Sequence, residues 1–299
     1  MQVFTTIAQA AQDTLTTVNA SLGLTGWALI SAVTLLSSFF YLRAKYNALK
    51  PALKQVATCG YVAPRPSEKH VRSLKKISKR LTDIQVGEIF YEGLENIRSV
   101  TGPRIVACNH PHWADAAILP QIIDGPARFM AHGRVMTSGW GLLGLFLSRR
   151  GAFAANDDIR DGGARTREAA VQIIMGGETL GIAPEGLTNF SPVPDIFKAG
   201  TVRIAREVAK RTGKAVHIVP VYIRYGRYPG PWLSKFDRAL QFKLVFIGFP
   251  LFRRKARVVA GTPISTDDLV DKSTGLPLSD EAASAYLREK VIALDPGKV

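Results

Sequence analysis

The first strong pattern along the chain is a long uncharged stretch near the N-terminus. Residues 14–42 contain no charged side chain, and residues 22–42 are mostly apolar. As a helix, these 21 residues extend about 31 Å, which matches the hydrocarbon core of a bilayer. Ser31, Thr34 and Ser38 share one helical face. The segment therefore fits either a spanning helix or the second arm of a hairpin that dips into one leaflet.

The flanks of this stretch favour a retained membrane anchor. Residues 4–22 repeat apolar side chains at three- and four-residue steps, as in an amphipathic helix, and Gly23 can turn the chain after them. No basic residue precedes the apolar run, which disfavours a cleaved signal peptide. Arg43 and Lys45 follow it, so the positive-inside rule predicts that the rest of the chain faces the cytoplasm. We predict an anchor over residues 1–60.

A basic amphipathic helix is predicted over residues 67–81, with apolar residues such as Leu74 and Ile77 on one side. The surrounding residues 43–80 hold eleven Lys or Arg and a single acid, Glu68, in a chain whose formal net charge is +15. This local excess favours contact with anionic lipid headgroups. A solvated helix face is the alternative. Nucleic acid is not expected as a partner, because no aromatic residues interleave the charges of residues 67–81.

The remaining chain, residues 61–299, alternates strands with helices, which predicts an α/β domain with a layered sheet flanked by helices. Expected strands are 86–91, 105–108, 179–183, 216–223 and 257–260; expected helices are 165–175, 198–212 and 279–294. Two cysteines, Cys59 and Cys108, are too few for a disulfide framework, and no Cys-x-x-Cys occurs. We expect a reducing compartment and no metal.

The first chemical motif is His110-x4-Asp115. His110 follows the predicted strand 105–108, and Pro111 suits the first position of a helix that Pro120 would interrupt. Side chains of a helix lean toward its N-terminus, so Asp115 can reach back to the imidazole. A carboxylate behind a histidine fixes its tautomer and stabilises the imidazolium. This is half a catalytic triad without its nucleophile; a structural histidine and a helix-capping Asp are the plainer alternatives.

The second chemical motif is Pro184-Glu185-Gly186, in a loop just past the end of the predicted strand 179–183. Open α/β sheets bind ligands at the carboxyl ends of their strands. An ordinary turn is the alternative for this common tripeptide.

Together, in this order and 70 residues apart, the two motifs resemble those of glycerolipid acyltransferases of the lysophosphatidate acyltransferase type. The resemblance covers about residues 85–265. It implies that His110 is the general base and Asp115 its orienting carboxylate. It also implies that the hydroxyl of a membrane lipid attacks the thioester of acyl-CoA or acyl carrier protein, with no cofactor. Such a donor is a co-substrate, and direct attack would explain the missing nucleophile. Further residues implied in substrate binding are Asn109, Glu185, Gly186 and Lys198.

Two positions depart from the family pattern. Asp157 stands where the family has an arginine that holds the acceptor phosphate, and Thr188 stands where an arginine commonly follows the Glu-Gly motif. Arg149, Arg150 or Arg160 would have to substitute for them, or else the acceptor is an uncharged lipid alcohol such as a diacylglycerol, an isoprenoid or a quinol.

Two other functions remain open from the sequence. One is a lipid ester hydrolase that activates water, although the chain has no Gly-x-Ser-x-Gly elbow. The other is a non-catalytic membrane adaptor, which has no reason to keep His110, Asp115 and Glu185 together.

Overall fold

The computed structural model describes residues 2–155, 161–226 and 255–297. The chain divides into two units, residues 1–52 and 53–299. The boundary lies earlier than the predicted one after Gly60, because Leu53 and Val56 are already buried in the second unit. Val56 packs there with Met136.

The N-terminal helix α1 (Gln2–Val56) is two helices that meet at Gly23, whose φ of 58° and ψ of −179° are not helical. Its second part, Gly26–Val56, is long and apolar enough to cross a membrane, by length and composition. The large apolar side chains between Leu29 and Leu42 are exposed. The predicted turn and apolar helix are therefore confirmed, and the helix continues past Leu42 through the basic flank.

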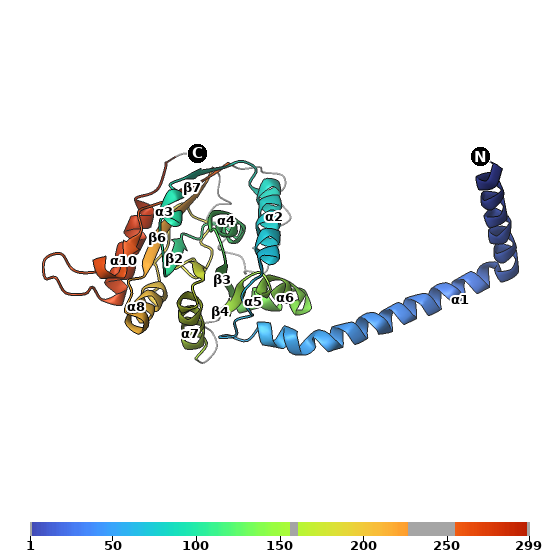
Figure 1. Ribbon diagram of the computed structural model, residues 1–299, viewed down its shortest axis with the longest axis horizontal. Coiled ribbons are helices and arrows are strands. Elements are labelled where there is room, and N and C mark those ends of the chain that lie inside the picture. The colour runs from blue at the N-terminus through green and yellow to red at the C-terminus, as the bar shows by residue number, and fades with distance from the viewer. Residues whose placement is uncertain (1, 156–160, 227–254, 298–299) are drawn as a thin grey trace. The chain divides into compact units, whose positions relative to one another are not determined.

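The second unit alternates helices and strands (Figure 1). Its helices are α2 (Glu68–Gln85), α3 (Glu95–Arg98), α4 (Asp115–Ile122), α5 (Gly133–Thr137), η1 (Gly139–Gly141), α6 (Leu142–Ser148), α7 (Gly162–Met175), α8 (Gly200–Thr212), η4 (Thr266–Asp268) and α10 (Asp280–Ile292). Its strands are β1 (Ile89–Glu92), β2 (Arg104–Cys108), β3 (Ala127–His132), β4 (Ala152–Ala155), β5 (Thr179–Ile182), β6 (His217–Tyr225), β7 (Ala256–Ala260) and β8 (Ile264–Ser265).

The strands form one sheet in the order β1-β7-β6-β2-β5-β3-β4, with β8 paired to β6. Strands β6, β2, β5, β3 and β4 run parallel, whereas β7 and β8 are antiparallel to β6. The register pairs Ile105 of β2 with Leu180 of β5 and Ile218 of β6. The carboxyl ends of β6, β2 and β5 therefore meet side by side at one edge of the sheet.

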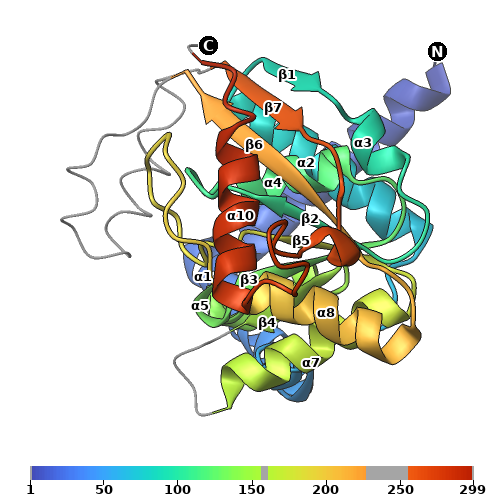
Figure 2. The same cartoon turned by 90° about the vertical axis from the view of Figure 1, so that its left-hand side faces the viewer.

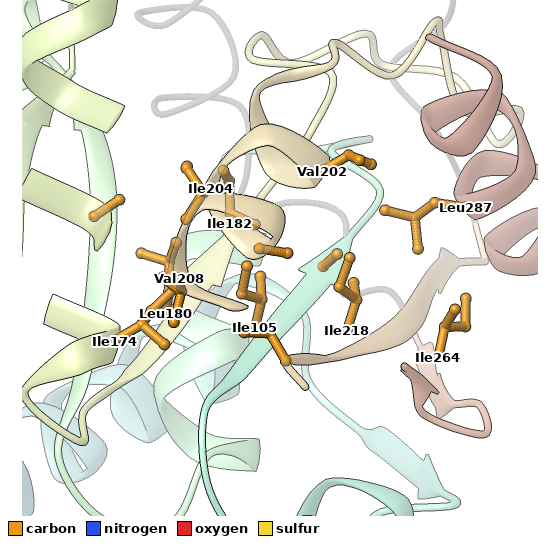
Figure 3. Packing of buried hydrophobic residues seen from close by; sticks show 14 of the residues in the cluster. Ile105, Ile174, Leu180, Ile182, Val202, Ile204, Val208, Ile218, Ile264 and Leu287 are labelled. Atoms are coloured by element: carbon orange, nitrogen blue, oxygen red, sulfur yellow. The ribbon is translucent and has the colours of Figure 1, made fainter. Parts of the chain in front are cut away.

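Both faces of the sheet are covered, which confirms the predicted α/β layers. Ile105, Leu180 and Ile218 pack against α7, α8 and α10 (Figure 3). Val106 and Cys108 point to the other face, where α4 covers them. Figure 2 shows α10 lying along β6 on its face of the sheet. This alternation follows from the two-residue period of a strand, and burial on both faces explains why the β2 segment is continuously apolar.

Helix α2 begins after Ser67, whose hydroxyl accepts the His70 N–H, as expected for an N-cap. The predicted apolar residues Val71, Leu74 and Ile77 are partly buried, whereas the most buried residues of the helix are polar. Thr82 is buried against α4, where its hydroxyl accepts a hydrogen bond from Gln121, while Leu81 remains exposed.

Candidate active site

The candidate site lies where β2, β5 and β6 end. His110 follows β2, the loop with Glu185 and Thr188 follows β5, and Tyr225 is the last residue of β6. Because these three strands are parallel neighbours, segments far apart in the sequence meet at one edge of the sheet.

The predicted pairing of His110 with Asp115 is present. The Nδ1 atom of His110 lies 3.0 Å from Oδ2 of Asp115. The helix behind them starts later than predicted, at Asp115 and not at Pro111, and it continues through Pro120 to Ile122. Residues 111–114 form turns because the Asp115 carboxylate accepts the His112 N–H and the His112 ring accepts the Ala114 N–H. The contact between the Asp115 carboxylate and the His110 ring does not depend on where the helix begins.

Asp115 is buried, at 1% exposed, and is surrounded by hydrogen-bond donors. Besides His110 and the His112 N–H, the hydroxyl of Tyr225 donates to its Oδ1 at 2.5 Å. Burial raises the pKa of Asp115, while these hydrogen bonds lower it by favouring the carboxylate. Tyr225 is not among the predicted site residues, because the apolar pattern ends the predicted strand at Ile223, whereas β6 continues to Tyr225.

A Tyr225→Phe variant should move the acidic limb of the activity–pH profile upward. The lost hydrogen bond no longer lowers the pKa of Asp115, so the carboxylate takes up a proton at higher pH. A hydrogen bond to a charged group is worth about 1.5–3 kcal/mol, so its loss should move the limb measurably. The measurement is activity between about pH 4 and 9, in steps of about half a pH unit.

Tyr222→Phe is the matched control, since the Tyr222 hydroxyl on the same strand donates to the Pro192 carbonyl and not to Asp115. Its acidic limb should stay in place. An unmoved limb in Tyr225→Phe would show that Tyr225 does not position Asp115.

Glu185 holds the site together. One of its carboxylate oxygens accepts the His110 N–H at 2.6 Å. The other accepts the Asn189 side-chain amide at 2.6 Å and the Asp195 N–H at 2.8 Å. Burial raises the pKa of Glu185, and the N–H groups of Asp195 and His110 lower it. Both oxygens are thus occupied by protein donors, so the observed task of Glu185 is to join the histidine to the following loop; its substrate-binding role stays a prediction.

Asn109 is also occupied within the protein. It is fully buried, its side-chain NH₂ donates to the Ile223 carbonyl at 3.0 Å, and its side-chain carbonyl accepts the Ile223 N–H at 2.7 Å. The predicted contact with substrate would require breaking this pair of bonds. Asn109 instead continues the pairing of β2 with β6 up to the site.

Thr188 brings a hydroxyl to the ring of His110. Its Oγ1 lies 3.2 Å from Nε2 of His110, on the opposite side of the ring from Asp115. On sequence grounds this residue is notable only as the replacement of an arginine. The structure places it in contact with the candidate base.

Gly186 and Lys198, both predicted to bind substrate, lie close together. Gly186 has a φ of 77°, and a Cβ atom there would come within 3.0 Å of Nζ of Lys198. Both features favour glycine, because other residues rarely adopt this backbone and a side chain would displace the lysine. Lys198 is exposed and supplies a positive charge beside the site.

Arg149 and Arg150 are not brought to the site. They precede β4, so they lie at the amino ends of the parallel strands, whereas His110 follows the carboxyl end of β2. The Arg150 guanidinium stacks on Phe146 at 3.6 Å and donates to Ser73 of α2. The prediction that these arginines replace the missing phosphate ligands is therefore not supported by their position. Asp157 and Arg160 lie outside the described residues.

No group of three or more His, Cys, Asp or Glu side chains that could hold a metal ion is found within the described ranges.

Residues 88–224 match the family model described as Acyltransferase. This segment of the chain is therefore similar to the acyltransferase family. The matched region runs from β1 to β6 and includes both sequence motifs, while Tyr225 lies one residue beyond it. The protein is accordingly an enzyme that transfers acyl groups.

A solved structure has the same fold as this acyltransferase. The crystal structure of the 1-acyl-sn-glycerophosphate (LPA) acyltransferase PlsC from Thermotoga maritima matches with a TM-score of 0.50 and 16% sequence identity, over 77% of this chain and 81% of that chain. At this identity the likeness concerns the fold. No curated protein sequence matches the chain significantly.

Proposed function

We propose that this acyltransferase moves a fatty acyl group from a thioester donor, acyl-CoA or acyl carrier protein, to the hydroxyl of a membrane lipid. The observation that carries the proposal is the His110–Asp115 pair, with Nδ1 held by a buried carboxylate and Nε2 facing a hydroxyl. A base so oriented can take the proton of a hydroxyl that attacks a thioester. General-base catalysis of this kind contributes about 10²–10⁴ in rate.

A lipid acceptor suits the surface around this base. The loop after Glu185 exposes three large apolar side chains, Leu187 at 38%, Val193 at 59% and Ile196 at 78%. Large apolar side chains so close together at a surface favour contact with a lipid or another apolar partner. The apolar helix Gly26–Val56 favours attachment of the enzyme to the membrane that holds such an acceptor. The basic residues after this segment support a cytoplasmic position of the catalytic unit.

We expect an uncharged lipid alcohol to be a better acceptor than lysophosphatidate. Two carboxylates, Asp115 and Glu185, lie at the base, and Arg149 and Arg150 lie at the other edge of the sheet. A phosphate dianion would gain attraction from Lys198 and repulsion from both acids. The measurement compares kcat/KM for a diacylglycerol, an isoprenoid alcohol, a quinol and lysophosphatidate. A preference for lysophosphatidate that collapses in Lys198→Gln would contradict the expectation and identify Lys198 as the phosphate ligand.

One experiment tests the reaction class itself. Full-length protein in detergent is incubated with acyl-CoA labelled in the acyl group and with the four acceptors. Transfer gives labelled lipid ester and supports the proposal. Labelled free fatty acid that forms at the same rate without acceptor would indicate a hydrolase. Absence of both products with every donor, including acyl carrier protein, would overturn the proposal.

A further inference from the structure

A cavity lies where the chain leaves the N-terminal helix. Its volume is about 480 Å³, within the roughly 300–1,000 Å³ that is usual for small-molecule sites. Its lining comes from the last turn of α1, the turn that follows α1, the end of α5, η1 and the start of α7, all in the second unit of the chain. Among the described residues, neither His110 nor the loop after β5 lines it. The proposed acyl transfer therefore does not account for this cavity.

Two glycines let the walls of the cavity approach one another closely. Gly141 of η1 has a φ of 82°, and a Cβ atom there would lie 3.3 Å from the Cβ of Leu53 in α1. Gly60 has a φ of 87°, and a Cβ atom there would lie 3.1 Å from the Cβ of Arg165 in α7. Both backbones adopt the left-handed region that favours glycine. The end of α1 and the turn after it thus pack directly against η1 and α7.

The lining combines apolar surface with two positive charges. Leu53, Ala57 and Cys59 contribute apolar side chains, since a free cysteine behaves as a small hydrophobe. Lys54 and Arg165 line the same cavity and are exposed to solvent. The described residues place no acidic side chain in the lining. This combination suits an amphipathic ligand that carries an anionic group.

The cavity begins where the candidate membrane span ends. The stretch Gly26–Val56 is long and apolar enough to cross a membrane, and Leu53 and Lys54 belong to its last turn. No acidic residue occurs in the sequence between Asp13 and Glu68. Anionic lipid headgroups attract basic residues that lie at the membrane surface. An anionic phospholipid is therefore the amphipathic ligand that the end of this helix would meet.

The surface beside the cavity offers a path for an acyl chain. Gly141, in the lining, is followed directly by α6, whose large apolar side chains Leu142, Leu143 and Phe146 are exposed. Exposed apolar side chains so close together favour contact with lipid. A chain whose headgroup lies at the two cations can leave the cavity over these side chains.

We propose that this cavity binds one anionic phospholipid, with its phosphate held by Lys54 and Arg165 and an acyl chain along the apolar lining. This lipid is a ligand separate from the acceptor at His110, and it joins the catalytic unit to the membrane surface at the end of α1. Its binding requires no acyl transfer, so the inference does not rest on the proposed function.

Native mass spectrometry of the full-length protein in detergent tests the inference. The protein is titrated with phosphatidylglycerol and, separately, with phosphatidylcholine that has the same acyl chains. We expect one phosphatidylglycerol to be retained, at lower concentration than phosphatidylcholine. Lys54→Gln and Arg165→Gln should each weaken its binding about fivefold, and the double variant about 25-fold, because each removes one cation from the headgroup.

Two further variants separate a built site from general attraction to a basic surface. Lys50→Gln removes the same charge one turn earlier in α1, at a residue that does not line the cavity, and should bind like wild type. Ala57→Trp fills the cavity without changing its charge and should abolish retention of the lipid. Thermal unfolding should show that both variants keep the fold.

Each other outcome overturns the site. Equal losses in Lys50→Gln and Lys54→Gln would show general attraction to the basic flank. Equal binding of phosphatidylcholine would show that the anionic charge is not recognised. Displacement by glycerol phosphate or inorganic phosphate at equal concentration would show a site for free phosphate. Unchanged binding in the double variant and in Ala57→Trp would place the lipid elsewhere. Because binding is the readout, none of these results bears on whether the enzyme acylates a lipid at His110.

Discussion

Replacing His110 with alanine should remove nearly all acyl transfer, with a loss of about 10²–10⁴ in kcat/KM. In the proposed function the imidazole takes the proton of the attacking hydroxyl, and the Asp115 carboxylate holds its Nδ1 at 3.0 Å. The side chain is 22% exposed and belongs to neither a helix nor a strand, so its removal should leave the fold intact. The measurement is transfer from labelled acyl-CoA at saturating lipid, together with thermal unfolding of the same preparation.

His70→Ala is the matched control for this variant. His70 lies in the first turn of α2 beside Ser67, in a different part of the catalytic unit. It should retain wild-type transfer. Near-normal activity in His110→Ala, with wild-type activity in His70→Ala, would rule out His110 as the base.

Asp115→Asn should cause the second large loss, also about 10²–10⁴ in kcat/KM. The carboxylate accepts from His110, the His112 N–H and Tyr225, and an amide would turn an NH₂ donor toward one of these donors. The imidazole can then take the wrong tautomer, with its proton on Nε2, and cannot accept from a hydroxyl. The measurement is transfer by the single variants and by the Asp115→Asn, His110→Ala double variant.

The double variant distinguishes orientation from general damage. If Asp115 acts only through His110, the second substitution adds almost nothing to the loss caused by the first. Independent, multiplicative losses would show that Asp115 has another task. Asp124→Asn is the surface control: Asp124 is about half exposed, pairs with Lys75 and Arg98, and should leave transfer unchanged.

The sequence was sufficient where strong apolar runs or motifs marked the elements. The strand before His110 and the strand before Glu185 were both predicted, because buried parallel strands are continuously apolar. The two strands at the far end of the sheet, β3 and β4, were not. The short β4 consists of Ala152, Phe153, Ala154 and Ala155, and alanine has little preference for strands.

The site was predictable only in its local part. His110 and Asp115 are five residues apart, so the geometry of one turn was enough to predict their contact. Thr188 and Tyr225 reach the same groups through the order of strands in the sheet, which no local pattern encodes. Arg149 and Arg150 were expected at the site but precede β4. They therefore lie at the amino ends of the parallel strands, away from His110.

Glu185 couples the position of His110 to that of the loop that follows β5. Its carboxylate joins the His110 backbone to Asn189 and Asp195, so residues 189–195 cannot move outward without loosening the histidine. Each of these bonds to a charged group is worth about 1.5–3 kcal/mol. An acceptor of the wrong shape that pushes the loop aside would therefore still bind but would meet a misaligned base. Discrimination between acceptors would then show in kcat more than in KM.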